Sequence, residues 1–350
     1  MLVKLEHRVV KLVVPAGDEA LWTADAPDDQ KSRLSEHTQS MMMTTSEVLA
    51  ALFELPEASS GDDLVAFLKQ HGPPPAGVDG EDPFRRLMRV ATRAERRSAA
   101  SIAGHQAAIR RLFPATPPDA ICAFCISEDR GPHPKYINTS LVEGASGLRL
   151  NGTKRWGSVA PDADLLYVAA SIGREGGRND LRMVVVPADR PGVTLDLEPY
   201  VGYGPEMRIA DITFDGVQVH AGEVIQGDAY LKYIKPFRLI EDVYNTVGTQ
   251  VAMFRLGTEY GWEDERLETL AALISQAAAV SSTDMASPEA ILLLSAYLRS
   301  SGEFWAKTWQ SWPDAPAEVI AKWSPDRSLL GVAERARETR RQNAWAELRR

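Results

Sequence analysis

The chain has 350 residues, 44% hydrophobic and 25% charged, with a net charge of −9 and a pI near 5.3. This length suffices for two or three domains with buried cores, and the composition excludes a disordered or fibrous protein. The negative charge argues against nucleic acid or an anionic membrane as a partner, because no large positive field would attract phosphates. We therefore expect a globular protein that binds neither nucleic acid nor membrane.

The chain begins MLVKLEHRVVKLVV, which charged residues interrupt throughout. A secretory signal needs a continuous apolar segment, so none is predicted here. The longest uncharged hydrophobic stretch, residues 269–283, is too short to span a bilayer. We expect a cytoplasmic protein.

Helical apolar spacing runs from the start of the chain to about residue 114. The clearest pieces are SEVLAALFEL (46–55) and DLVAFLKQ (63–70), followed by one long candidate at 84–113. Breaks rich in Pro and Gly, such as GPPPAGVDGEDP, separate them. This pattern predicts an N-terminal helical domain over residues 1–117.

From residue 118 the apolar period changes from 3.6 to 2. Turn signals such as EGASG, REGGRND and DRPG separate six short runs rich in Val, Ile and Leu, and Asn151-Gly152 reads as a tight turn. Six strands without intervening helices predict a middle β-barrel or sandwich domain over residues 118–228. The runs are AICAFCIS, LRLNGTKRW, DLLYVAAS, LRMVVVP, VTLDLEP and IADITFDGVQV.

The chain has two cysteines, Cys122 and Cys125, on the first of these runs. Residues three apart on a strand point to opposite faces, so this pair can neither close a disulfide easily nor share a metal. We favour two buried cysteines over a redox pair. The six histidines show no metal-ligand spacing, so no metal site is expected, and His105 and His133 are predicted to be structural or solvated.

Helical spacing returns after Asp228. Pro236 suits a first helical turn, and an apolar stripe follows from Phe237 to Phe254. Further candidates predict a C-terminal helical domain over residues 229–350, and the arginine-rich end reads as a solvated or inter-subunit helix. The fold class is therefore α+β: an N-terminal helical domain, a middle β-domain and a C-terminal helical bundle. The further candidates are residues 264–280, 287–309 and 326–349.

Four segments between residues 119 and 227 resemble the acyl-CoA dehydrogenase family, in the family's order and with compatible gaps. The resemblance implies an FAD cofactor, an acyl-CoA substrate, an electron-transfer acceptor, and a homo-oligomer or a hetero-oligomer with a related subunit. The segments are FCISE (124–128), LNGTKRWGS (150–158), ADLLYVAAS (163–171) with VVVPADRPGVTL downstream, and ITFDGVQVHAGEVIQG (212–227).

The resemblance also implies cofactor-binding residues. In this family the Trp of the second segment packs on the flavin isoalloxazine ring, and a hydroxyl two residues later bonds its polar edge. Carried over, these are Trp156 and Ser158, with Phe124, Ile126 and Ser127 on the same ring. An indole offers a flat apolar face to a planar ring. The alternative is that Trp156 is a core aromatic at a domain junction.

Several family features are changed or missing. The loop that holds cofactor or CoA phosphate is replaced by SEDRGPHPKYI (127–137), with Gly131 its only glycine. Gly157 stands where a branched residue is usual and removes a side chain that would stabilise the strand. The C-terminal motifs that bind FAD across a subunit boundary have no counterpart beyond Arg266. Half of the usual FAD site is therefore unsupported by the sequence.

Dehydrogenation of an acyl thioester needs a base for the α-proton. The late Tyr-Glu-Gly-Thr segment of most family members is absent, but some members use a glutamate early in the first C-terminal helix. LIEDVYNTVG resembles that motif and implies Glu241 as the base, with Gly248 seven residues later. Glu241 lies at the border of the apolar stripe. The alternative is a solvated glutamate near a helix start.

The sequence thus predicts a flavin-dependent acyl-CoA dehydrogenase-like oxidoreductase. Two alternatives stay open, because function resides in the site and not in the fold. One is a non-catalytic companion subunit or scaffold of the same fold. The other is a flavin monooxygenase on this fold, which would not need the glutamate.

Overall fold

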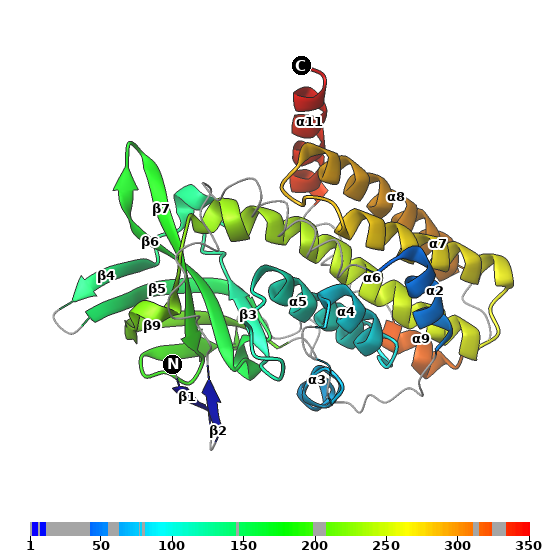
Figure 1. Ribbon diagram of the computed structural model, residues 1–350, viewed down its shortest axis with the longest axis horizontal. Coiled ribbons are helices and arrows are strands. Elements are labelled where there is room, and N and C mark those ends of the chain that lie inside the picture. The colour runs from blue at the N-terminus through cyan, green and yellow to red at the C-terminus, as the bar shows by residue number, and fades with distance from the viewer. Residues whose placement is uncertain are drawn as a thin grey trace. The chain divides into compact units, whose positions relative to one another are not determined.

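The computed structural model describes residues 2–5, 8–11, 43–54, 63–76, 78, 81–144, 147–198, 208–310, 315–323 and 334–350. The chain divides into two compact units. The strand unit comprises residues 1–12, 61–73 and 112–238, and the helix unit comprises residues 13–60, 74–111 and 239–350. The predicted α+β class, with helices before and after a β-sheet region, is confirmed (Figure 1). The predicted three domains at 1–117, 118–228 and 229–350 stay a prediction.

The strand unit is built on one eight-stranded sheet with the order β10-β7-β6-β4-β5-β9-β8, and β3 pairs in parallel with β6. All six predicted runs form strands of this sheet. The two short strands β4 and β10 were not predicted, because neither has a clear alternating pattern. The strands are β3 (Cys122–Cys125), β4 (Ser140–Gly144), β5 (Gly147–Ser158), β6 (Leu165–Glu175), β7 (Arg178–Pro187), β8 (Val193–Asp196), β9 (Ile209–Val219) and β10 (Val224–Ile225).

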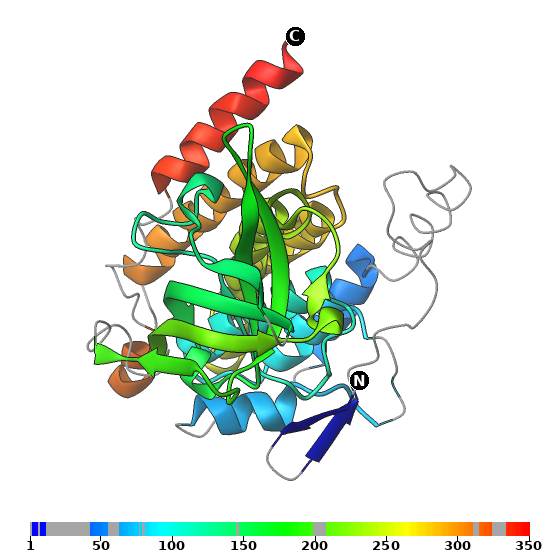
Figure 2. The same cartoon turned by 90° about the vertical axis from the view of Figure 1, so that its left-hand side faces the viewer.

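Strands β6 and β7 form a long antiparallel ribbon that ends at a turn containing Gly176 and Gly177 (Figure 2). Both glycines have positive φ, which a side chain would disfavour. The predicted turn signal REGGRND is located here. Local turn chemistry therefore sets the register of this ribbon.

The start of the chain differs from the helical prediction. Residues Leu2–Leu5 (β1) and Arg8–Lys11 (β2) form an antiparallel hairpin. Valines and charged residues are spread through both segments, and β-branched residues favour strands. The next described element of this unit is helix α3 (Leu64–His71), which begins where Asp63 accepts hydrogen bonds from two backbone N–H groups.

The predicted Asn-Gly turn is wrong. Asn151 and Gly152 lie inside the twelve-residue strand β5, where its register against β9 shifts. Gly152 has φ +140, and a Cβ there would lie 2.6 Å from the Cα of Thr139. The Asn151 side chain accepts a hydrogen bond from the N–H of Gly216 on β9 at 2.7 Å. The pair therefore forms a β-bulge, and the chain reverses instead between Gly144 and Gly147.

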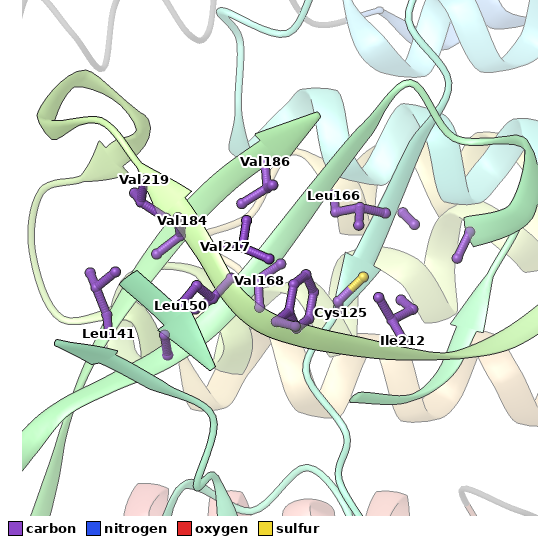
Figure 3. Close-up of a cluster of buried hydrophobic side chains, with 14 of the residues drawn as sticks. Cys125, Leu141, Leu150, Leu166, Val168, Val184, Val186, Ile212, Val217 and Val219 are labelled. Carbon is purple, nitrogen blue, oxygen red and sulfur yellow. The ribbon is translucent and has the colours of Figure 1, made fainter. Parts of the chain in front are cut away.

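The core of the strand unit is aliphatic except for Cys125 and Phe214, and its residues follow the period-2 pattern (Figure 3). Gly157 lies against it, and a Cβ at this position would lie 2.7 Å from the Ile212 side chain. A branched side chain here would overlap this core, so the glycine does not simply weaken the strand. The labelled core residues are Cys125, Leu141, Leu150, Leu166, Val168, Val184, Val186, Ile212, Val217 and Val219.

The two cysteines are both buried and form no disulfide. Burial raises the pKa of the Cys125 thiol to about 12. A thiol with this pKa stays protonated at neutral pH and reacts slowly. The prediction of two buried cysteines is confirmed.

The helix unit contains eight helices among the described residues (Figure 1). The first four residues of α6 and the last residue of α5 belong to the strand unit. No helix in the described part of the chain is long and apolar enough to cross a membrane. The helices are α2 (Thr45–Phe53), α4 (Pro83–Ala91), α5 (Arg97–Leu112), α6 (Lys235–Glu259), α7 (Asp264–Ser281), α8 (Pro288–Gln310), α9 (Ala317–Trp323) and α11 (Glu334–Leu348).

The single helix predicted over residues 84–113 is in fact two, α4 and α5. At the break the Thr92 hydroxyl donates to the Arg89 carbonyl at 3.0 Å. The N–H groups of Arg93 and Ala94 bond carbonyls three residues back, which tightens the last turn. Of the candidate at 326–349, residues 334–348 form α11, and residues 326–333 lie outside the described residues.

Candidate functional site

Trp156 is held in an unusual backbone conformation. It lies where the register of β5 against β9 shifts between Lys154 and Gly157. Its φ is +61, and its side chain is 47% exposed. A left-handed conformation costs a non-glycine residue about 1–2 kcal/mol. Such outliers gather at functional sites, and here the conformation accompanies a large exposed indole.

The residues just after β3 lie beside Trp156. The N–H of Arg155 donates to the carbonyl of Ser127 at 2.8 Å, which joins this segment to β5. Ser127 and Ser158 are partly exposed. Three of the five predicted flavin contacts are therefore at least partly exposed. They are Ser127, Trp156 and Ser158, and they lie near the ends of β3 and β5.

The other two predicted contacts, Phe124 and Ile126, are buried. The Phe124 ring packs against Phe237 with centroids 4.0 Å apart. The ring centroid of Phe113 lies 6.1 Å from that of Phe124. Phe113 also stacks on Tyr167 and Tyr233, with centroid distances of 4.3 and 4.9 Å. No sequence motif marks this aromatic cluster, because its members come from the end of α5, two strands, the π-helical turn Tyr230–Ile234 and the start of α6.

An ion pair involves Lys154, two residues before Trp156 on β5. Lys154 is 0% exposed and donates to Glu128 at 2.8 Å and to the Ile126 carbonyl at 3.3 Å. Glu128 also accepts hydrogen bonds from the backbone N–H groups of Asn138 and Thr139 and from the Thr139 hydroxyl. The pair therefore ties the segment carrying Ser127 to the strand carrying Trp156.

Burial and charge act in opposite directions on this pair. Burial lowers the pKa of Lys154, although Glu128 opposes the shift. For Glu128, burial favours the neutral acid, but Lys154 and the backbone donors outweigh it and lower the pKa of the carboxyl. Both residues fall within the family-like segments quoted above, but their pairing was not predicted.

The loop at residues 127–137 presents cations. Gly131 has φ +92, and its N–H closes a tight turn on the Glu128 carbonyl at 2.8 Å. The Arg130 guanidinium and the Lys135 ammonium lie 4.2 and 4.8 Å from the Tyr136 ring centroid. His133 is exposed in this loop and caps a short 3₁₀ turn.

The helix unit contains the predicted base, Glu241 of α6. Its Oε1 lies 2.8 Å from Nδ1 of His105 on α5. The Glu241 side chain is 20% exposed and the His105 side chain 8% exposed. The sequence showed no link between these residues, which are 136 positions apart.

Two glycines bring α5 and α6 together at this point. A Cβ on Gly104 would lie 2.6 Å from the Tyr244 carbonyl oxygen, and a Cβ on Gly248 would lie 2.6 Å from the Ala100 carbonyl oxygen. The helices therefore touch backbone to backbone and run antiparallel. The crossing places His105 of α5 opposite Glu241 of α6. Glu241 lies about one helical turn before Tyr244.

The neighbouring carboxylate Asp242 is neutralised from the C-terminal helix. Arg337 of α11 donates to it at 2.6 and 3.1 Å, and Arg340 lies 3.4 Å away. The arginine-rich end, expected to be solvated or inter-subunit, therefore uses two of its cations inside the helix unit. Asp242 therefore pairs with arginines, whereas Glu241 pairs with His105.

No group of three or more His, Cys, Asp or Glu side chains is arranged to hold a metal ion among the described residues.

Comparison with known proteins identifies the centre of the chain. Residues 123–217 match the family model "Acyl-CoA dehydrogenase, middle domain". A probable acyl-CoA dehydrogenase FadE10 of Mycobacterium tuberculosis is 34% identical over 99 residues, which cover 27% of this chain and 15% of that protein. Benzylmalonyl-CoA dehydrogenase of Aromatoleum aromaticum is 32% identical over 115 residues, 32% of this chain and 30% of that protein. The matched segment thus spans under a third of these relatives.

Solved structures share the fold over nearly the whole chain. Butyryl-CoA dehydrogenase from Megasphaera elsdenii matches with a TM-score of 0.61 at 15% identity, covering 91% of this chain and 94% of that one. An acyl-CoA dehydrogenase from Geobacillus kaustophilus matches with a TM-score of 0.57 at 14% identity, covering 93% and 99%. The fold therefore extends beyond the segment that sequence comparison detects.

Proposed function

Because residues 123–217 match the middle domain of the acyl-CoA dehydrogenase family and the chain shares the fold of butyryl-CoA dehydrogenase, we propose that it is a flavin-dependent oxidoreductase of this family that dehydrogenates an acyl-CoA thioester between Cα and Cβ. The observation that carries this proposal is Trp156, an exposed indole held in a left-handed conformation beside Ser127. Strained residues of this kind gather at functional sites.

The residues near the ends of β3 and β5 suit an isoalloxazine ring. Trp156 offers a flat apolar face, and Ser127 and Ser158 offer partly exposed hydroxyl donors for the polar edge of the ring. Phe124 and Ile126 would support this surface from the protein side. FAD, when bound, supplies the acceptor for the hydride that leaves Cβ.

Glu241 is the proposed base. A carboxylate that is largely withdrawn from water can take the α-proton as the Cα–H bond breaks, and general-base catalysis of this kind contributes about 10²–10⁴-fold. The proton then resides on Glu241 while the product acquires its double bond. An electron-transfer acceptor must reoxidise the flavin, and we propose that the protein works as an oligomer with itself or a related subunit.

A second candidate is a companion subunit that shares or lacks the flavin. It is favoured by the loop at residues 127–137, where exposed cations and a single left-handed glycine replace the family's glycine-serine backbone. The cofactor phosphates would then depend on a related chain. A colourless protein that takes up flavin only with such a partner would support this candidate.

The test is the visible spectrum of the purified protein, followed by turnover of straight-chain acyl-CoA thioesters with a dye acceptor. We expect about one FAD per chain and bleaching by substrate. Glu241→Gln should retain the flavin and lower turnover about 10²–10⁴-fold. Unchanged turnover in this variant would exclude Glu241 as the base and favour a reaction that needs none, such as flavin monooxygenation.

A further inference from the structure

The histidine opposite the proposed base has no role assigned to it so far. We infer that His105 is a positioning residue that holds the Glu241 carboxylate in the orientation needed for removal of the α-proton. This inference rests on the proposed dehydrogenase function. It concerns a side chain on α5, whereas the base is on α6.

The contact between the two side chains is constrained from several sides. His105 Nδ1 and Glu241 Oε1 are 2.8 Å apart, within hydrogen-bonding distance. The imidazole is 8% exposed and lies on a helix that touches α6 backbone to backbone at Gly104 and Gly248. Neither helix can rotate or move outward without losing this packing. The histidine is therefore held at a fixed distance from the carboxylate.

The chemistry of the contact suits a positioning role. When Nδ1 carries the proton, its N–H donates to Oε1 and removes much of the rotational freedom of the carboxyl group. The carboxylate held in this way is the group to which we assign the α-proton. A general base must lie within hydrogen-bonding reach of the proton it takes, and small displacements of a catalytic group are costly.

The charges around the pair are compatible with this role. Asp242, the adjacent acid on α6, is bound by Arg337 and Arg340 of α11. Arg337 interacts electrostatically with Glu241 as well as with Asp242. The arginines thus neutralise Asp242, and His105 contributes a hydrogen bond to Glu241.

The competing explanation is a purely structural bond between two helices. A structural bond would change stability, but it would leave the catalytic step of a folded variant unaffected. The two explanations therefore differ in how kcat and KM respond, and in whether the effect of His105 depends on Glu241.

The experiment compares three substitutions of His105 in the full-length protein. His105→Asn keeps an N–H donor close to the place of Nδ1, His105→Gln moves the donor to the place of Nε2, and His105→Leu removes it. Ile109→Val, a buried residue of the same helix, is the matched control for general loosening of α5. Steady-state kcat and KM, with the melting temperature of each variant, are measured on the acyl-CoA panel with a dye acceptor.

We expect His105→Leu and His105→Gln to lower kcat by about 10–100-fold, with KM changed less than about 3-fold. His105→Asn should recover most of the loss, and Ile109→Val should keep full kcat. In a Glu241→Gln background, His105→Leu should have no further effect on kcat. If His105→Leu fails to fold, the comparison of Asn with Gln carries the same test.

Equal kcat in the Asn, Gln and unaltered proteins would overturn the inference, as would an equal loss from His105→Leu with and without Glu241. These outcomes differ from a failure of the proposed function. If Glu241→Gln itself retained full turnover, or if the unaltered protein turned over no thioester of the panel, the base assignment would fail and the role of His105 with it.

Discussion

Two acid–base pairs, one in each unit, show different uses of a buried carboxylate. In the strand unit, Glu128 pairs with a fully buried lysine and accepts three further hydrogen bonds. In the helix unit, Glu241 meets His105 and keeps 20% of its side chain exposed. The first carboxylate is enclosed by donors, whereas the second has one side directed to a histidine and part of its surface open.

The difference indicates which pair supports structure and which is suited to chemistry. A carboxylate that accepts four hydrogen bonds, one of them from a buried lysine, is strongly stabilised in its ionised form and is therefore a weak base. A carboxylate that pairs with a histidine and keeps part of its side chain exposed is better placed to accept a substrate proton. We therefore expect substitutions in the first pair to affect stability and substitutions in the second to affect turnover.

The largest effect is expected from Lys154→Met, which would break the first pair. Removing the lysine leaves Glu128 as a buried charge without its partner, which destabilises a protein by about 3–5 kcal/mol. Urea denaturation followed by circular dichroism measures the loss. The double variant Lys154→Met with Glu128→Gln should recover part of it. A loss of less than about 1 kcal/mol in the free energy of unfolding would show that the pair contributes little to stability.

A smaller effect is expected from Gly104→Ala at the helix crossing. The added Cβ would overlap the Tyr244 carbonyl and push α5 away from α6, which costs about 1–3 kcal/mol. Turnover should fall as well, because His105 would move relative to Glu241. Gly302→Ala in α8 is the matched control, since a Cβ there meets no atom within 4 Å. It should be neutral or stabilising by about 0.5–1 kcal/mol.

Trp156→Gly separates function from stability within the strand unit. Glycine tolerates φ +61 without strain, so the free energy of unfolding should stay constant or rise by about 1 kcal/mol. Flavin affinity should fall, because the flat apolar face is lost. Equilibrium titration with FAD and urea denaturation measure the two quantities. A marked loss of stability with unchanged flavin affinity would support the alternative that Trp156 is a core residue.

The smallest response is expected from the two cysteines. In the native protein Cys122 and Cys125 should resist a thiol reagent at neutral pH, because both are buried and the pKa of Cys125 is raised to about 12. In denaturant both should react. Rapid reaction of the native protein would contradict the burial of this strand and reopen the redox interpretation.

The strand unit shows how far the sequence could lead. Its six predicted strands follow from alternating apolar residues and local turn signals, which act over a few positions. At Asn151-Gly152 the same local signals predicted a turn where the structure has a bulge. The hydrogen bond that accompanies the bulge comes from Gly216 on another strand, which local signals do not reveal. They also missed the end of α4 at Thr92 and the strands at the start of the chain.

The sequence by itself determined the α+β class, six strands of the sheet, the burial of the cysteines and the family-like segments that include Trp156. These features depend on residues close together along the chain. Only the tertiary structure decided that Lys154 pairs with Glu128 and that His105 faces Glu241. The second pair depends on two helices meeting at Gly104 and Gly248, far apart in sequence, where the absence of a side chain allows their backbones to touch.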